Sequence, residues 1–270
     1  MMKVKIVDTT LRDGEQKAGI ALGVNEKVQI AKYISDLDVY QLEVGVPAMG
    51  GEEKRSIEKI AQLGLSCKIA AWNRMSIEDI RHSIDCNVDI IHISVPTSDI
   101  QINSKLNKDR KWVLSQMSRA IYFAKEKGYE VNLGFEDASR ASIDFLIELS
   151  RYASCLDVKT VRYADTVGIL YPRKTFEIIS SLKKNTDMAI EIHSHNDFGM
   201  AISNSIAAIK AGAEFVDCTF GGIGERAGNC DLIKFLNSYS VLIEREMKDK
   251  YKSLKETERM IMNWCFGISS

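Results

Sequence analysis

The sequence predicts an α/β fold, a (β/α)8 or TIM barrel, that forms one domain. Eight short apolar runs recur along the 270 residues, and each is followed by a segment with the apolar spacing of an amphipathic helix. The repeat is roughly 25–35 residues, the length of one strand and one helix, and no low-complexity linker interrupts it. We expect strands at residues 4–10, 39–47, 67–73, 89–96, 129–135, 160–166, 189–195 and 215–220.

The C-terminal part of the chain has a different pattern. We expect the barrel domain to occupy residues 1–247 and to be closed by a helix over residues 231–247. Residues 248–259 are strongly charged and residues 260–266 are apolar again, which predicts a helical tail over residues 248–270. An apolar segment in such a place normally packs against something, so we expect this tail to contact a partner.

The composition gives no sign of a nucleic-acid or membrane partner. The formal net charge is −1, and no apolar run approaches the roughly 20 residues of a transmembrane helix. The six cysteines form no C-x-x-C pair, and the N-terminus has no signal-peptide pattern. We therefore expect a cytoplasmic protein whose cysteines are reduced.

Two histidines stand at the end of the seventh predicted strand. His193 and His195 are two residues apart, so a strand directs both side chains to the same face. Two imidazoles with a carboxylate nearby can hold a divalent cation. A strand end that carries two histidines by chance is the plainer alternative, but the whole chain has only four histidines.

Further polar residues follow the ends of other predicted strands, where the active sites of such barrels lie. In a closed barrel the eighth strand lies beside both the seventh and the first. Asp13 and Asn229 can therefore meet His193 and His195 from three adjacent strands. A carboxylate, two imidazoles and an amide oxygen, with room for water, suit Mg²⁺, Mn²⁺ or Zn²⁺.

Each of these signals also has a purely structural interpretation. Arg12 and Asp13 can form an ion pair at the barrel rim, and Glu43 can accept backbone hydrogen bonds. The glycine-rich run at residues 221–229 is similar to a phosphate-binding turn but matches no nucleotide motif, and Thr166 can belong to a simple turn. Their gathering at one end of one barrel favours a metal-assisted enzyme.

Three motifs in combination resemble those of a known family. They are D-T-T-L-R-D-G-E-Q at residues 8–16, H-S-H-N-D at residues 193–197 and G-G-I-G-E-R-A-G-N at residues 221–229. The set is similar to the DRE-TIM metallolyases, which include homocitrate, 2-isopropylmalate and citramalate synthases and, more distantly, hydroxymethylglutaryl-CoA lyase. The resemblance covers nearly the whole chain. Within the family, residues 72–74 and 136–140 are most similar to the homocitrate synthases of nitrogen-fixing bacteria.

The resemblance implies an acyltransferase that carries out a metal-dependent Claisen condensation of acetyl-CoA with a 2-oxo acid. It implies a divalent metal held by Asp13, His193 and His195, with Asn229 near the ion or bound to it. Arg12 would contact the substrate and stabilise the oxyanion that forms as the keto carbon is attacked. The resemblance also implies substrate-binding residues and a residue that orients the base for acetyl-CoA: Gln16, Glu43 and Thr166 for the substrate, and Glu136 for the base.

The expected 2-oxo acid is 2-oxoglutarate, which would give homocitrate. Lysine-pathway homocitrate synthases carry a histidine after strand three and an arginine in strand five for the distal carboxylate. The matching places here hold Asn73, Arg74 and Asn132, and Arg74 can take over that carboxylate. Shorter acids such as 2-oxoisovalerate, pyruvate or oxaloacetate stay open, as in 2-isopropylmalate, citramalate or Re-citrate synthases. The activity of a related lyase and the role of a non-catalytic regulatory subunit also stay open.

The resemblance also implies a partner chain. Family synthases continue past the barrel into a C-terminal segment, and a histidine in that segment pairs with the glutamate matching Glu136 to deprotonate acetyl-CoA. In this sequence no histidine follows His195. We expect a second polypeptide to supply that segment in trans, within an oligomer. A truncated piece of a longer chain is the rival explanation.

Overall fold

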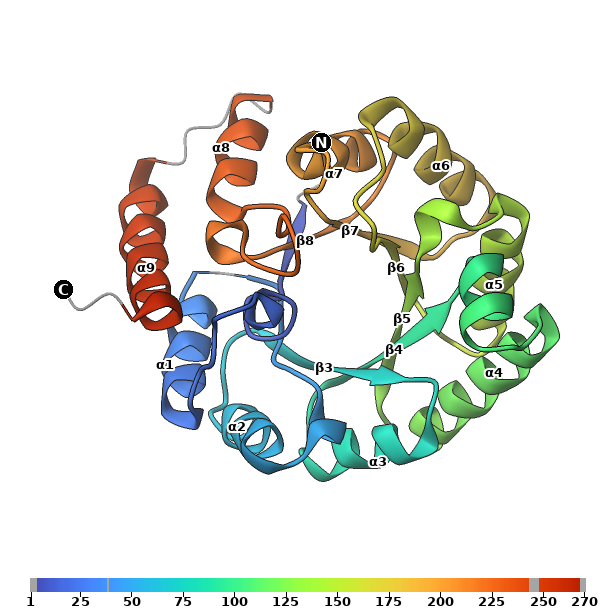
Figure 1. Ribbon diagram of the computed structural model, residues 1–270, viewed down its shortest axis with the longest axis horizontal. Helices are drawn as coiled ribbons and strands as arrows, with labels where there is room; N and C mark the ends of the chain where they lie inside the picture. Colours follow the sequence, from blue (N-terminus) through green and yellow to red (C-terminus); the bar gives the residue numbers. More distant parts are fainter. Residues whose placement is uncertain (1–3, 38, 243–247, 268–270) are drawn as a thin grey trace.

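The eight predicted strands form a closed parallel barrel in the computed structural model, which describes residues 4–37, 39–242 and 248–267. The strands follow one another in chain order, and the first pairs with the eighth (Figure 1). The predicted (β/α)8 fold is thus confirmed. The strands are β1 (Lys5–Asp8), β2 (Gln41–Glu43), β3 (Lys68–Arg74), β4 (Ile90–Pro96), β5 (Glu130–Glu136), β6 (Thr160–Asp165), β7 (Ala189–Ser194) and β8 (Phe215–Cys218).

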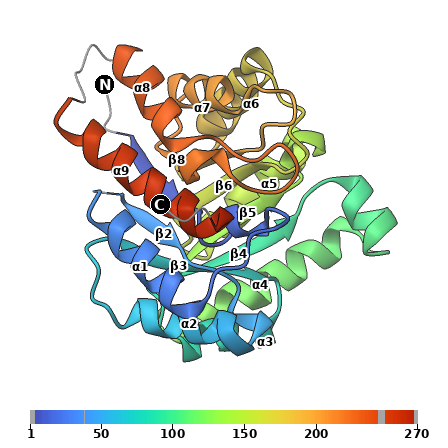
Figure 2. The ribbon, with the colours of Figure 1, turned by 60° about the vertical axis from the view of Figure 1, so that its left-hand side comes forward.

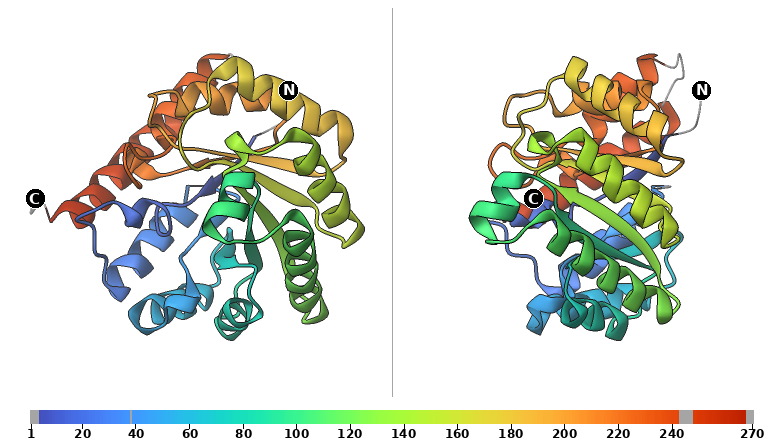
Figure 3. Two further views of the ribbon diagram at one scale, coloured as in Figure 1. Left: turned by 45° about the vertical axis from the view of Figure 1, so that its right-hand side comes forward. Right: turned by 90° about the vertical axis from the view of Figure 1, so that its right-hand side faces the viewer.

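Figure 1 shows the helices arranged around the ring of strands, and the two further views in Figure 3 show them along the flanks of the strands. Their buried residues recur every three or four positions, as in α4, where Val113, Met117 and Ala120 are buried. The helices are α1 (Val24–Ser35), α2 (Gly51–Ala61), α3 (Ile77–Asp85), α4 (Arg110–Glu126), α5 (Ile143–Cys155), α6 (Pro172–Asn185), α7 (Ala201–Lys210), α8 (Leu232–Leu242) and α9 (Lys248–Phe266).

The alternation of side chains along the strands separates two environments. In β7, Ile190 and Ile192 belong to the apolar core between strands and helices. Glu191, between them, forms an ion pair with Arg162 of β6, and Arg162 also reaches Glu43 of β2. Because β2 and β6 are not neighbours in the barrel, this last contact crosses its interior. The apolar core therefore lies between the strands and the helices, whereas the interior of the barrel contains charged side chains.

The first two strands are shorter than predicted because turns end them. The carbonyl of Thr9 accepts hydrogen bonds from the backbone N–H groups of Arg12 and Gly14, at 3.1 and 3.0 Å. The chain folds back there, so Arg12 follows the strand in a turn. After β2, Pro47 begins a short 3-10 helix, η2 (Pro47–Met49), because it has no N–H to continue a strand ladder.

The long polar connection predicted at residues 97–111 contains a helical turn of its own. A π-helix, η3 (Ile100–Lys105), follows β4, and α4 begins at Arg110. The connection is held to the end of β5 by two side-chain hydrogen bonds: Ser98 donates to Asp137, and Gln101 donates to Glu136. It therefore covers one side of the face where the strands end.

The C-terminal helix packs on the barrel. Figure 2 shows α9 next to α1. The side chains of Leu254, Ile261 and Cys265 in α9 are buried. The ring of Trp264 lies 6.0 Å from that of Tyr33 in α1. Phe266, at the end of the helix, is 46% exposed. Part of the predicted closing helix, residues 243–247, lies outside the described residues.

Helices long and apolar enough to cross a membrane are absent from the described parts of the chain.

Candidate metal centre and active-site cavity

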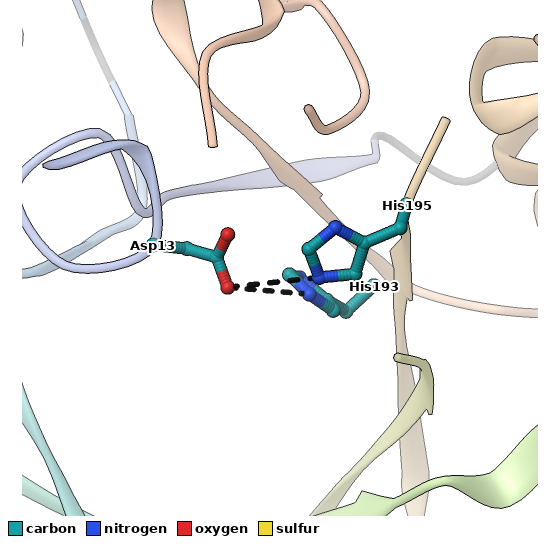
Figure 4. A group of neighbouring side chains, drawn as sticks. All are labelled: Asp13, His193 and His195. Carbon is teal, nitrogen blue, oxygen red and sulfur yellow. Dashed lines mark ion pairs between the residues drawn. The ribbon is translucent and has the colours of Figure 1, made fainter. Parts of the chain in front are cut away.

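Three side chains meet where β1 and β7 end. His193 lies in β7, His195 follows that strand, and Asp13 comes from the turn after β1 (Figure 4). The Oδ2 atom of Asp13 lies 3.6 Å from Nε2 of His193 and 3.9 Å from Nε2 of His195. Both β1 and β7 pair with β8, so the adjacency expected from the sequence is what brings these residues together.

The geometry of this group fits a divalent cation. All three side chains are buried, and their ligand atoms lie within 4.8 Å of one another. The separations from Asp13 to the two histidines are too long for hydrogen bonds. They are within the span of about 4.2 Å that two ligands of one ion can have when each bond is about 2.1 Å. One carboxylate and two imidazoles are a donor set that Mg²⁺, Mn²⁺ and Zn²⁺ accept.

The electrostatics prepare Asp13 as an anionic ligand. Burial alone would raise its pKa, but Arg12, His193 and His195 together hold it well below the ordinary range. Burial, helped by the neighbouring His193, lowers the pKa of His195 to about 4. His195 is therefore neutral at neutral pH, and a neutral imidazole is the form that binds a metal.

Asn229 lies against the same group. Its Nδ2 atom donates to Oδ1 of Asp13 at 2.7 Å and to the carbonyl of Ile223 at 3.0 Å. Its buried Oδ1 atom has no hydrogen-bond partner among the described residues. A Cβ atom at Gly224 would collide with the amide of Asn229, and Gly224 has a φ of +150°. Glycine is required there for the amide to approach Asp13.

Arg12 lies beside this group and is held by two carboxylates. Its Nη1 atom donates to Oδ2 of Asp13 at 2.6 Å, and its Nε atom donates to Oε1 of Glu43 at 2.5 Å. Glu43 is fully buried, and although burial would raise its pKa, Arg12 and Arg162 hold that pKa well below the ordinary value. The side chain of Arg12 is 10% exposed, so a fixed cation remains accessible from the cavity.

A cavity of about 240 Å³ opens above these residues, at the C-terminal ends of the strands. It brings together most of the site residues expected from the sequence, namely Arg12, Asp13, Gln16, Glu136, Thr166, His193 and His195. Glu43 is not part of the lining and supports Arg12 from below. A hollow of about 530 Å³ lies elsewhere, on the outer surface along α5, and contains none of these residues.

The structure does not bring Arg74 to the cavity, although the sequence suggested it for the distal carboxylate. Its side chain is 71% exposed and forms a two-pronged ion pair with Asp79 of α3, at 2.7 and 2.8 Å. Asn132, the other candidate position, lies inside the barrel and donates to Gln41 at 3.4 Å. Neither residue lines the cavity.

Glu136, at the end of β5, is held at the edge of the cavity. It accepts hydrogen bonds from Ser94 of β4, at 3.3 Å, and from Gln101 of η3. The backbone carbonyl of Glu136 accepts a third hydrogen bond, from the hydroxyl of Thr97. The connection after β4 thereby fixes the orientation of this carboxylate.

Several residues of the site were missed by the sequence reasoning. His92, Ser94 and Arg162 line the cavity, and Gly134 gives space to the ring of His92, whose Nε2 atom would collide with a Cβ there. Burial and Arg162 lower the pKa of His92 well below its ordinary value. The available signal was a charged or polar residue inside each otherwise apolar strand, because a buried charge needs a partner.

Comparisons with known proteins identify the family and several relatives of this chain. The family described as HMGL-like matches residues 3–261. Homocitrate synthase subunit alpha of Clostridium pasteurianum is 56% identical in a match 269 residues long that covers 97% of this chain and 100% of that protein. 2-Isopropylmalate synthase 2 of Caldanaerobacter subterraneus is 51% identical over 85% of this chain, which spans only 60% of that protein.

The solved structures include an HMG-CoA lyase from Bacillus subtilis with a TM-score of 0.85, which covers 99% of this chain and 95% of that one. At 16% identity this likeness concerns the fold alone. The match over residues 3–261 covers nearly the whole chain, and it confirms the family resemblance drawn from the three motifs. The chain therefore belongs to the HMGL-like family.

Proposed function

We propose that this chain is the barrel subunit of an acyltransferase that condenses acetyl-CoA with a 2-oxo acid, with 2-oxoglutarate as the first candidate and homocitrate as its product. The observation that carries the proposal is the meeting of Arg12 with Asp13, His193 and His195 on one cavity. It is supported by the full-length similarity to homocitrate synthase subunit alpha.

The metal site in this proposal consists of Asp13, His193 and His195, with Asn229 adjacent to Asp13. A bound divalent ion, Mg²⁺, Mn²⁺ or Zn²⁺, would act as a Lewis acid toward the keto group of the substrate. The chain itself contributes the orientation of the acid. Gln16 and Thr166 line the cavity on the side of β1 and β6, where they can contact a small carboxylic acid.

Arg12 is proposed to stabilise the negative charge that develops on the keto oxygen. Its guanidinium is always charged, and Glu43 and Asp13 fix its direction, so little reorganisation is needed as charge develops. Glu136 is proposed to orient the group that removes the proton from the methyl group of acetyl-CoA. Its carboxylate is already directed by Ser94 and Gln101.

A second polypeptide is proposed to supply the general base. The relative that this chain covers completely is named as a subunit, whereas the longer 2-isopropylmalate synthase carries additional residues. Among the four histidines of the chain, His193 and His195 belong to the metal site, and His82 lies on α3 on the outside. His92 lines the cavity, but its lowered pKa makes it a weak base.

The choice of the 2-oxo acid in this proposal rests on the relatives, and 2-oxoglutarate stands first because of the similarity to homocitrate synthase subunit alpha. The lining of the cavity also includes Trp72, His92 and Ser94, whereas the side chain of Arg74 pairs with Asp79 outside the cavity. Because 2-isopropylmalate synthase 2 is 51% identical, 2-oxoisovalerate is the second candidate, ahead of pyruvate and oxaloacetate.

The test is calorimetric binding of each of the four acids to the purified chain, with Mn²⁺ and with a chelator. We expect 2-oxoglutarate to bind only when Mn²⁺ is present. Tighter binding of 2-oxoisovalerate would replace homocitrate by 2-isopropylmalate as the product. If none of the acids binds in the presence of Mn²⁺, the proposed function is wrong.

A further inference from the structure

Below the cavity, the interior of the barrel contains a network of charges centred on Arg162. Its guanidinium donates to Glu191 at 2.5 Å and to both oxygens of Glu43, at 2.7 and 3.2 Å. Its Nε atom also lies 3.4 Å from Oδ2 of Asp217. These residues come from β6, β7, β2 and β8, and all four side chains are at most 3% exposed. Interiors of such barrels are usually filled by branched apolar side chains.

This network reaches the metal centre by two routes. On one side Glu43 holds Arg12, which contacts Asp13. On the other side Asp217 contacts the imidazole of His193, with 2.8 Å between Oδ2 and Nδ1. The two routes meet where Nε2 of His193 faces Asp13, so the contacts lead from Arg162 through both routes to the same pair of residues.

We propose that Asp217 is a positioning residue that fixes His193 as a metal ligand, an inference that rests on the proposed metal site. With its Nδ1–H donated to Asp217, the ring of His193 presents the lone pair of Nε2 toward Asp13. Asp217 is itself fixed, because the hydroxyl of Thr9 donates to its Oδ1 atom at 2.7 Å and Arg162 lies beside Oδ2. A carboxylate behind a ligating histidine sets the tautomer and the direction of the ring.

Only one of the two histidines is held by a carboxylate in the described structure: Asp217 contacts His193. The Nδ1 atom of His195 is buried and has no hydrogen-bond partner among the described residues. His193 therefore has a fixed direction, whereas His195 is held by the backbone and packing alone. Loss of Asp217 should consequently act on metal binding through His193.

Glu191 provides the matched control. It pairs with Arg162 at 2.5 Å, is equally buried, and belongs to the same network, but it has no hydrogen bond or ion pair to either histidine. If Asp217 served only to neutralise Arg162, Asp217→Asn and Glu191→Gln would have similar effects. If Asp217 positions His193, only Asp217→Asn should weaken the metal site.

The experiment measures Mn²⁺ affinity by calorimetry for the wild type, Asp217→Asn and Glu191→Gln. We expect Asp217→Asn to lose roughly 10- to 100-fold in affinity, the scale for removing such a support, and Glu191→Gln to bind like the wild type. Nitrogen NMR of the metal-free protein gives a second readout. It should find Nδ1 of His193 protonated in the wild type and in Glu191→Gln, with a changed tautomer ratio in Asp217→Asn.

The outcomes separate the two proposals. A wild type that binds no Mn²⁺ would refute the metal site of the proposed function. A wild type that binds Mn²⁺, with unchanged affinity and tautomer in Asp217→Asn, would overturn the role of Asp217. Equal losses in Asp217→Asn and Glu191→Gln would do the same. If Asp217→Asn does not fold, Thr9→Val provides the test. This variant removes the hydrogen bond from Thr9 to Asp217 without removing a charge, and it should also lower the affinity for Mn²⁺.

Discussion

The two histidines of the site differ in their surroundings although they share one strand end. Burial would lower the pKa of His193, but Asp217 raises it above the ordinary value, whereas burial and His193 lower the pKa of His195 to about 4. A cation therefore competes with a proton mainly at His193. Arg12 differs from both, because its charge is permanent and its direction is fixed by Glu43.

At the residue scale, replacing His195 by Ala should abolish Mn²⁺-dependent binding of the 2-oxo acid. The fold should be kept, because the Nδ1 atom of His195 makes no hydrogen bond in the described structure. Calorimetry measures the binding, and circular dichroism measures the fold. His82→Ala, on α3 outside the barrel, is the matched control and should bind normally. Equal affinities in the two variants would remove His195 from the site.

Arg12→Lys should act on the chemical step more than on substrate binding. Lysine keeps the charge but loses the planar fork that contacts both Asp13 and Glu43. We expect kcat of the complete enzyme to fall by roughly 100-fold or more, the scale for removing an oxyanion donor. Steady-state kinetics measure this, with Arg173→Lys on the exposed face of α6 as control. A raised KM with unchanged kcat would make Arg12 a binding residue only.

At the scale of elements, the loop after β8 delivers Asn229 to the site. Arg226 fastens this loop by pairing with Asp197 at 2.9 Å and by donating to the carbonyl of Thr166 at 2.7 Å. Gly224 gives the amide of Asn229 its space. The loop is thus held to the ends of β6 and β7, and its glycines permit a close approach to Asp13.

Gly224→Ala should weaken Mn²⁺ binding without unfolding the protein. The new methyl group would displace the amide of Asn229 and would lie 3.0 Å from Oδ1 of Asp13. Gly64→Ala is the matched control, because Gly64 also has a positive φ, +65°, but has no atom within 4 Å of the added Cβ. Calorimetry should find reduced affinity in Gly224→Ala alone. The same loss in both variants would point to backbone strain as the cause.

The buried carboxylate of Asp8, at the end of β1, predicts a pH dependence of stability. Asp8 is fully buried and accepts two hydrogen bonds from Thr10, and burial raises its pKa from 3.8 to about 7. The folded protein then keeps a proton that the unfolded chain releases. The stability that this group contributes is full below its unfolded pKa and is lost as the pH rises toward 7.

The Asp8→Asn variant has no carboxylate at this position, so its stability should not show this decrease with rising pH. Relative to the variant, the wild type should lose stability between about pH 4 and about pH 7, by at most roughly 4 kcal/mol. Urea unfolding of the metal-free proteins at about pH 5 and about pH 8 measures the difference. A constant difference across this range would mean that Asp8 ionises normally in the folded protein.

At the scale of the whole molecule, the barrel encloses the candidate metal site, and the connection after β4 directs the side chain of Glu136. Of the four histidines of the chain, His193 and His195 belong to the candidate site, His92 lies in the barrel interior and His82 lies on the outer surface. α9 places most of its apolar side chains against the barrel, so a surface for the proposed partner has to include other residues.

The purified chain alone should bind Mn²⁺ and the 2-oxo acid but should condense acetyl-CoA slowly. A missing general base typically costs roughly 10²- to 10⁴-fold in rate. Free-thiol release from acetyl-CoA measures the condensation, first with the chain alone and then with the candidate second polypeptide. Activity should rise on its addition. A rate that is the same with and without that polypeptide would contradict the two-chain proposal.

From the sequence alone, the barrel could be predicted and three candidate metal ligands could be named. The periodicities of strands and helices are local properties of the sequence, and the strands of such a barrel follow one another in chain order. The proximity of Asp13, His193 and His195 could therefore be predicted. The motif at residues 221–229 likewise indicated Asn229, which contacts Asp13 as expected.

The pairing of charges inside the barrel could not be predicted from the sequence, because it depends on where distant strands lie in space. Arg162 and Glu43 are separated by 119 positions and lie on strands that are not neighbours, so no local pattern relates them. Arg74 was expected in the cavity, but a closer partner, Asp79, holds it outside. The choice among partners depends on side-chain direction and distance, which periodicity does not specify. The contact between Asp217 and His193 likewise could be found only in the structure.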